Sequence, residues 1–361
     1  MTLKAAIVGT GGVAHLHAQA LQGDPRVELV AVSNRSAERR TAFADQYDVE
    51  GRYASIDELL AGETLDVVVL CTPPDLHLEQ ALAAFAAGVN VLCEKPPALS
   101  LAELDQMQAA ADAAGLALAI VFQQRTGTAA AHVKRLLDAG ALGRPLLAQC
   151  QTLWLRQDDY YAADWRGTWD GEGGGTTLGH GIHQMDLLAY LLGDWTEVDA
   201  RVWRLARDIE MEDVSTATIQ FAGGVVATAV SSVLSPRETS YVRIDTELAT
   251  VEVEHLYGHS GANWHLTPAR GVSAEQAATW ALPANDEPSG HLPLVRAVID
   301  ALSTGAALPD LVTHARRPLE LVTAIYASAT RGEPITRASL AADDRFQRSL
   351  RADVEDLRPG R

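Results

Sequence analysis

The sequence contains little cysteine, few aromatic residues and no excess of basic side chains. Only three of its 361 residues are cysteine, Cys71, Cys93 and Cys150, and their spacing matches no metal-binding motif. An odd number without a disulfide framework predicts a reducing, cytoplasmic location. The 29 Lys and Arg against 47 Asp and Glu give a net charge of −18, with no basic block, which argues against a nucleic-acid partner.

Long apolar runs are also absent. No stretch reaches the length of a membrane span, and the N-terminus leads directly into a strand pattern without the features of a signal peptide. We therefore expect no membrane partner. Hydrophobic residues make up 47% and charged residues 21%, which is a globular composition, and the length predicts two domains.

The first third of the chain alternates short apolar runs with Ala-rich helical stretches. The expected strands are 5–8, 27–32, 67–70, 89–93 and 116–122, and the expected helices are 13–21, 37–47, 76–87 and 101–114. Such βαβ alternation requires parallel strands with right-handed crossovers. Residues 1–122 are therefore predicted to form an α/β Rossmann domain with a doubly wound parallel sheet.

The pattern changes after residue 122. The expected strands are now 146–155, 198–205, 215–221, 225–233, 241–246, 250–255 and 264–267, and the expected helices are 129–139, 182–192, 292–303 and 317–329. Because few helices separate these strands, residues 123–361 are predicted to form a C-terminal α/β domain on a large, mostly antiparallel sheet. A short hinge is expected near residues 122–125. A large sheet with few covering helices predicts a homodimer or homotetramer packed through it.

A glycine-rich turn joins the first strand to the first helix. Gly9, Thr10, Gly11, Gly12 and Val13 precede Ala14 in a G-x-G-x-x-A pattern. The first glycine permits the tight turn, the second lets the backbone approach a pyrophosphate, and the helix N-terminus attracts its charge. In this βαβ context the turn predicts a dinucleotide cofactor, although glycine-rich turns also join strand to helix without a ligand.

The cofactor type depends on the end of the second strand. A carboxylate there would bind the ribose 2′-hydroxyl and repel a 2′-phosphate, but this position is Asn34. Arg35 and Arg39 follow, and arginine suits phosphate. These residues favour NADP over NAD. Two alternatives remain: the arginines form a solvated helix face, and Asn34 binds the free 2′-hydroxyl of NAD.

Several motifs in the chain together resemble the glucose–fructose oxidoreductase, inositol dehydrogenase and rhizopine catabolism (Gfo/Idh/MocA) family. They follow one another in the family's order, as Cys71-Thr72-Pro73-Pro74-x-x-His77, Cys93-Glu94-Lys95-Pro96, Trp165-Arg166-Gly167-Thr168-Trp169, Gly173-Gly174-Gly175 and Gly181-Ile182-His183-Gln184-Met185-Asp186. The resemblance implies a Rossmann domain followed by an oligomer-forming α/β domain. It also implies NAD(P)-dependent redox chemistry on sugars, inositols and related polyols.

The resemblance assigns roles to individual residues. It implies that Lys95 is the catalytic lysine and that His183 is its histidine partner. The residues that it places at the cofactor are Thr72, Pro73, His77, Glu94, Lys95, Trp165 and Arg166. One position departs from the family: many members carry an acid four residues before the histidine, where this chain has Gly179, and His180 beside it is a candidate substitute.

The chemistry of these residues supports the same roles. Hydride transfer from an alcohol needs a base for the hydroxyl proton and a donor for the developing alkoxide. Lys95 follows a buried strand at the carboxyl edge of the sheet, where ligands bind in such folds. The candidate substrate-binding residues are Lys95, Gln123, Trp165, His180, His183 and Asp186. Asp186 either orients a substrate hydroxyl or makes a local helix contact. For His180, the structural alternative is a helix cap.

Three alternatives stand beside the dehydrogenase prediction: a metal site and two other functions. His180, His183 and Asp186 are spaced as metal ligands on a helix, but three ligands without another His or Cys cluster do not make a metal site, and we expect no metal. An NAD-dependent glycoside hydrolase would use the same fold without net cofactor turnover. A non-catalytic dinucleotide-binding regulator is the third alternative, against which Lys95 and His183 argue.

Overall fold

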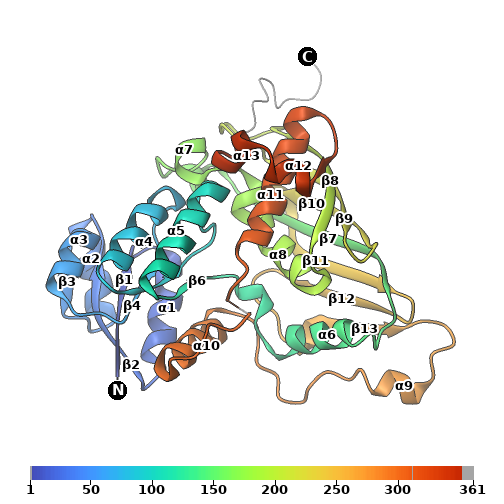
Figure 1. Cartoon of the computed structure of the whole chain (residues 1–361), viewed down its shortest axis with the longest axis horizontal. Helices are drawn as coiled ribbons and strands as arrows, with labels where there is room; N and C mark the ends of the chain where they lie inside the picture. The colour runs from blue at the N-terminus through green and yellow to red at the C-terminus, as the bar shows by residue number, and fades with distance from the viewer. Residues whose placement is uncertain (1, 311, 352–361) are drawn as a thin grey trace. The chain divides into compact units, whose positions relative to one another are not determined.

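The computed structural model describes residues 2–310 and 312–351, and the chain forms two compact units (Figure 1). The first unit contains residues 1–98, 102–121 and 291–315, and the second contains residues 99–101, 122–290 and 316–361. Apart from the three residues 99–101, the chain passes to the second unit after residue 121, next to the predicted hinge. Residues 291–315, which the sequence pattern assigned to the second domain, belong to the first unit instead.

The first unit is built on a parallel six-stranded sheet in the order β3-β2-β1-β4-β5-β6, which confirms the predicted Rossmann arrangement. Its strands are β1 (Leu3–Val8), β2 (Val27–Ser33), β3 (Gly51–Tyr53), β4 (Val67–Leu70), β5 (Asn90–Cys93) and β6 (Leu118–Ile120). Its helices are α1 (Gly12–Gln22), α2 (Ala37–Gln46), α3 (Ile56–Gly62), α4 (His77–Ala86), α5 (Leu101–Ala114) and α10 (His291–Thr304). The sequence pattern missed β3 and α3, which are too short to show periodicity.

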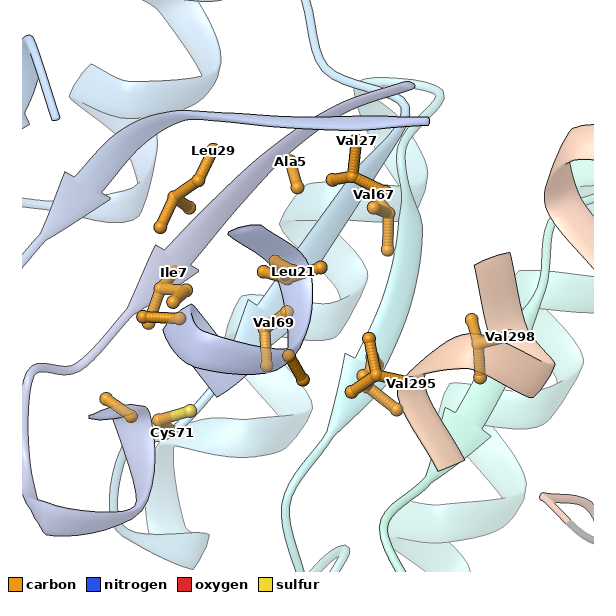
Figure 2. Packing of buried hydrophobic residues seen from close by; sticks show 14 of the residues in the cluster. Ala5, Ile7, Leu21, Val27, Leu29, Val67, Val69, Cys71, Val295 and Val298 are labelled. Carbon is orange, nitrogen blue, oxygen red and sulfur yellow. The ribbon is translucent and has the colours of Figure 1, made fainter. Parts of the chain in front are cut away.

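The core of the first unit explains why α10 belongs there. Ile7 and Val69 from neighbouring strands pack with Leu21 of α1, and α10 adds Val295 and Val298 to the same cluster (Figure 2). These side chains occupy one face of α10, at the spacing of a helix packed against a core. The long separation in sequence hid this contact from pattern analysis.

The second unit is built on an eight-stranded sheet in the order β13-β12-β11-β7-β10-β9-β8-β14. Its strands are β7 (Pro145–Leu155), β8 (Trp195–Trp203), β9 (Val214–Phe221), β10 (Val226–Ser232), β11 (Leu234–Thr246), β12 (Ala249–His255), β13 (Trp264–Pro268) and β14 (Ile335–Thr336). Neighbours are antiparallel except β7 and β10, which are parallel. The predicted mostly antiparallel sheet is therefore confirmed.

Two buried helices lie against this sheet. α8 (Ile182–Leu192) contacts β7 and β11, and α11 (Arg316–Arg331) contacts β8. The remaining helices are α6 (Thr128–Asp138), α7 (Trp169–Glu172), α9 (Ala274–Ala278), α12 (Arg337–Ala341) and α13 (Asp344–Arg348). A π-helical turn, Thr177–Gly181, leads directly into α8 and carries His180. Among the described residues, no helix combines the length and apolar character that a membrane crossing requires.

Candidate active site

The glycine turn after β1 has the geometry of a dinucleotide cradle. Gly9 has φ +91°, and a Cβ there would lie 2.7 Å from the Cys71 carbonyl oxygen, so no other residue fits without strain. Gly11 and Gly12 are exposed, and a Cβ at either would meet no atom within 4 Å. The backbone at the start of α1 is thus open on the side where a pyrophosphate would approach, so the residues present fit the predicted cofactor.

The end of β2 is organised around the side chain of Asn34. Its Nδ2 donates to Thr10 Oγ1 at 2.8 Å, and its Oδ1 accepts from the Ser36 amide at 2.8 Å. Asn34 therefore ties the second strand to the glycine turn. Arg35 and Arg39 are exposed, so the cationic groups predicted to favour a phosphate remain accessible within this unit.

The predicted catalytic lysine lies at the same sheet edge as the glycine turn. β1, β4 and β5 are adjacent and parallel, so Gly9, Thr72 and Lys95 follow strand ends on one side of the sheet. Pro73 continues the loop after β4. The Glu94 amide donates to the Leu70 carbonyl at 3.0 Å, which continues the β4–β5 pairing up to the lysine.

His77 is fully buried and links two of these loops. Its Nε2 lies 2.9 Å from the Thr72 carbonyl oxygen and its Nδ1 lies 3.0 Å from the Pro96 carbonyl oxygen. Burial lowers the pKa of this imidazole, and the carbonyl groups that face its ring nitrogens act against this. Its ring nitrogens are engaged by the protein backbone, so its geometry supports the shape of the loop after β4.

Glu94 is the centre of a cluster that the sequence pattern did not reveal. His17 and His291 both contact its carboxylate, and the three side chains are the one group among the described residues that could hold a metal ion. They come from positions far apart in the chain, and no spacing rule could have joined them. His180, His183 and Asp186, whose spacing was considered above as a possible ligand set, do not form such a group within those residues.

In the second unit, His180 and His183 pack against one tryptophan. The ring centroids of Trp154 lie 5.1 Å from His180 and 6.2 Å from His183, and both histidines are buried. Tyr257 stacks on Trp154 at 4.8 Å and is 61% exposed, and Tyr160 lies 5.6 Å from His180. Aromatic faces at this spacing suit the C–H faces of a sugar.

Arg156 is the cation of this aromatic cluster. It follows the last residue of β7 and lies two positions after Trp154, so strand alternation directs both to the same side. Its guanidinium lies 4.9 Å from the Trp154 ring and 5.2 Å from the Tyr160 ring. It donates to His180 Nε2 at 3.1 Å and to the Tyr257 hydroxyl at 2.6 Å. The sequence pattern had singled out neither Trp154 nor Arg156.

The π-helical turn that carries His180 is held by a buried acid. Glu212 accepts from the Gly175 amide at 3.2 Å, the Thr177 amide at 2.9 Å and the Tyr326 hydroxyl at 2.9 Å. Burial raises the pKa of the Glu212 carboxyl, against these hydrogen bonds. A Cβ at Gly175 would lie 2.1 Å from the Glu212 carbonyl oxygen, so this glycine provides close packing.

The other predicted residues of the second unit have varied surroundings. Asp186 is fully buried, and both of its oxygens accept from Arg125. Asp186 therefore contacts a residue 61 positions away in the chain rather than a neighbour in its own helix. Arg166 stacks on Trp165 at 4.3 Å and pairs with Glu172 at 3.0 Å.

Gln123 lies in a short 3₁₀ turn, Gln123–Arg125, at the start of the second unit. The residues predicted to act together thus fall into two groups. Lys95 lies in the first unit, and His180 and His183 lie in the second.

Comparison with known proteins gives two family matches. Residues 3–122 match the model described as "Oxidoreductase family, NAD-binding Rossmann fold", and residues 130–252 match the "GFO/IDH/MocA C-terminal domain". The matches adjoin one another in the order that the fold shows. They cover the glycine turn, Lys95 and His183.

Individual relatives agree with this assignment. A 1,5-anhydro-D-fructose reductase from Ensifer adhaerens is 33% identical over 168 residues, which are 46% of this chain and 50% of that protein. The chain thus spans about half the length of that relative. A D-apiose dehydrogenase from Paraburkholderia graminis is 27% identical over 94% of this chain and 91% of its own.

A solved structure resembles the whole fold. The WlbA dehydrogenase from Bordetella pertussis, in complex with NADH and UDP-GlcNAcA, matches with a TM-score of 0.83 and 28% identity, over 93% of this chain and 99% of that one.

Proposed function

Because the chain belongs to the Gfo/Idh/MocA family of NAD-binding oxidoreductases, we propose that it transfers a hydride between a nicotinamide cofactor and a carbon of a sugar, inositol or related polyol. The observation that carries this proposal is the position of Lys95 at the sheet edge that also holds the glycine turn. The aromatic cluster around His180 and His183 supports a polyhydroxylated substrate.

The roles of the residues follow from their chemistry. Gly9 to Gly12 and the start of α1 would hold the pyrophosphate of the cofactor. When bound, the nicotinamide accepts or supplies the hydride. The Lys95 ammonium donates a hydrogen bond to the reacting oxygen of the substrate, and His183 takes or relays its proton. Tyr257, which is 61% exposed, would present an apolar face to the sugar ring.

Replacing Lys95 or His183 by alanine tests the mechanism. General acid–base groups contribute about 10²–10⁴-fold, so each variant should lose turnover by that order while cofactor affinity changes little. A panel of sugars and inositols with NAD and NADP, followed by the absorbance of the reduced nicotinamide, provides the assay. Lys4→Ala, at an exposed position, is the matched control.

Two results would contradict the proposal. Normal turnover in Lys95→Ala would remove the lysine from the mechanism. Substrate conversion without net reduction of the cofactor would favour a glycoside hydrolase, and cofactor binding without any conversion would favour a regulator.

We further propose that the protein prefers NADP to NAD. Asn34 carries no charge to repel a 2′-phosphate, and Arg35 is exposed beside it. Asn34→Asp should reverse the order of affinities. Arg35→Ala should weaken NADP binding by about 10–100-fold, the usual effect of losing a hydrogen bond between charged groups, and leave NAD binding unchanged. Fluorescence titration measures both, and a native preference for NAD would overturn the proposal.

The cellular location and partners follow from the same properties. We propose a cytoplasmic enzyme, and its three cysteines, all free and buried, suit a reducing compartment. The charge of −18 supports a small-molecule substrate rather than nucleic acid.

A further inference from the structure

Three side chains from distant parts of the sequence meet at Glu94. His17 lies within α1, Glu94 follows β5, and His291 is the first residue of α10. His17 Nε2 lies 2.8 Å from Glu94 Oε1, and His291 Nε2 lies 3.1 Å from the same oxygen. All three belong to the first unit, and α1 and α10 pack together in its core (Figure 2).

The carboxylate determines which ring nitrogens carry protons. An ionised carboxylate only accepts hydrogen bonds, so both imidazoles must present an N–H at Nε2. His17 is fully buried, and its Nδ1 has no hydrogen-bond partner in the part of the chain that the structure describes. Burial lowers the pKa of His17, so its ring is neutral with the single proton on Nε2.

Glu94 remains ionised despite its burial. Desolvation raises the pKa of this carboxyl, but the hydrogen bonds from His17 and His291 outweigh it and hold the pKa well below the usual range. Electrostatic attraction to His291 and His17 lowers the pKa of Glu94 as well. The negative charge of Glu94 is thus kept inside the unit by two imidazoles.

Other titratable groups also lie near the Glu94 carboxylate. Burial raises the pKa of the Cys71 and Cys93 thiols well above their ordinary values, and burial lowers the pKa of His77. All three groups interact with Glu94 electrostatically, and the two thiols stay protonated near neutral pH.

The second carboxylate oxygen of Glu94 contacts the backbone of Lys95. The Lys95 amide donates to Glu94 Oε2 at 3.2 Å. The Glu94 carboxylate therefore makes two connections. Its Oε1 contacts the histidines of α1 and α10, and its Oε2 contacts the backbone of Lys95. A side chain held at both oxygens has little freedom to rotate.

We propose that His17 and His291 are positioning residues, which hold Glu94 and through it the backbone of Lys95 in the place from which the lysine acts. This inference rests on the proposed function only in giving Lys95 a catalytic role. The two histidines do not touch the reacting atoms; they set the starting point of the lysine side chain. Small displacements of a reacting group lower turnover strongly, because the group must meet the substrate in one geometry.

The test compares variants that remove or keep the N–H group that each histidine donates to Glu94. His17→Leu and His291→Leu remove it, whereas His17→Gln and His291→Gln place an amide N–H at a similar reach. The leucine variants should lose turnover by about 10–100-fold, as for a hydrogen bond to a charged group, and the glutamine variants should recover most of it. The dissociation constant for the reduced cofactor should change much less. His15→Leu, on the same helix but bonded to Tyr47, is the matched control.

A second measurement reports the lysine without catalysis. The lysines of this chain are Lys4, Lys95 and Lys134. Mild acylation of the cofactor-bound protein, followed by mass spectrometry, gives the labelling rate of each. The leucine variants should change the Lys95 rate severalfold and leave the Lys4 and Lys134 rates as internal standards. The glutamine variants should label like the wild type.

Three outcomes would overturn the inference. The first is wild-type turnover and labelling in both leucine variants. The second is equal loss in the leucine and glutamine variants, which indicates a packing role. The third is one equivalent of a tightly bound divalent metal whose removal reproduces the leucine variants, which would make the cluster a metal site. If Lys95→Ala keeps its turnover, the proposed function fails instead, and the labelling rates still decide whether the histidines position Lys95.

Discussion

Arg156 determines which nitrogen of His180 carries the ring proton. A guanidinium has no acceptor, so His180 Nε2 must accept its hydrogen bond and the proton of a neutral ring lies on Nδ1. Many family members have an acid at the position of Gly179. This chain instead has a ring N–H donor at the next residue, His180. Because Nε2 accepts from Arg156, it is not the nitrogen that would remove a proton from the substrate.

Replacing Arg156 by methionine tests this assignment. The variant should lose the ¹⁵N chemical-shift signature of an Nδ1-protonated His180, and turnover should fall about fivefold, because one orienting hydrogen bond contributes about 1 kcal/mol. Tyr257→Phe removes another partner of the guanidinium but keeps the bond to His180, so it should preserve the signature. An unchanged spectrum in Arg156→Met would show that another contact sets the tautomer.

At the scale of the element, the π-helical turn depends on close packing by glycine. Gly175→Ala would press a methyl group against the backbone of Glu212, and overpacking of this kind costs about 1–3 kcal/mol. Gly179→Ala is the matched control, because a Cβ there meets no atom within 4 Å and alanine favours a helix over glycine by about 1 kcal/mol. Urea denaturation should show a lower free energy of unfolding for the first variant alone. Equal stabilities would mean that the turn can shift.

At the scale of the whole molecule, the large sheet of the second unit leaves an exposed apolar pair. Leu147 of β7 and Val226 of β10 are paired in register, and they are 42% and 39% exposed. We predict that this face mediates a homodimer or homotetramer. Leu147→Asp with Val226→Asp should shift the protein towards monomer in light scattering at micromolar concentration, since burying two carboxylates in an interface is costly. The exposed Leu205→Asp is the control, and a monomeric wild type would contradict the prediction.

The sequence alone determined the features that depend on neighbouring residues. Strand and helix periodicity, the G-x-G-x-x-A turn and the motif around Lys95 predicted a parallel Rossmann sheet followed by a mostly antiparallel one, because these signals arise within one or two elements. The family resemblance carried by these motifs named Lys95, His180 and His183 as candidates. Short elements such as β3 lacked enough residues to show a period.

The tertiary structure decided which distant residues share a site. α10 returns to the first unit because its apolar face completes the core against α1, and this brings His291 to Glu94, 197 residues away in sequence. Arg156 reaches His180 because β7 ends beside the π-helical turn, and Arg125 takes up the carboxylate of Asp186. Such contacts depend on how hydrophobic faces pack, and packing between elements far apart in the chain leaves no periodic signal in the sequence.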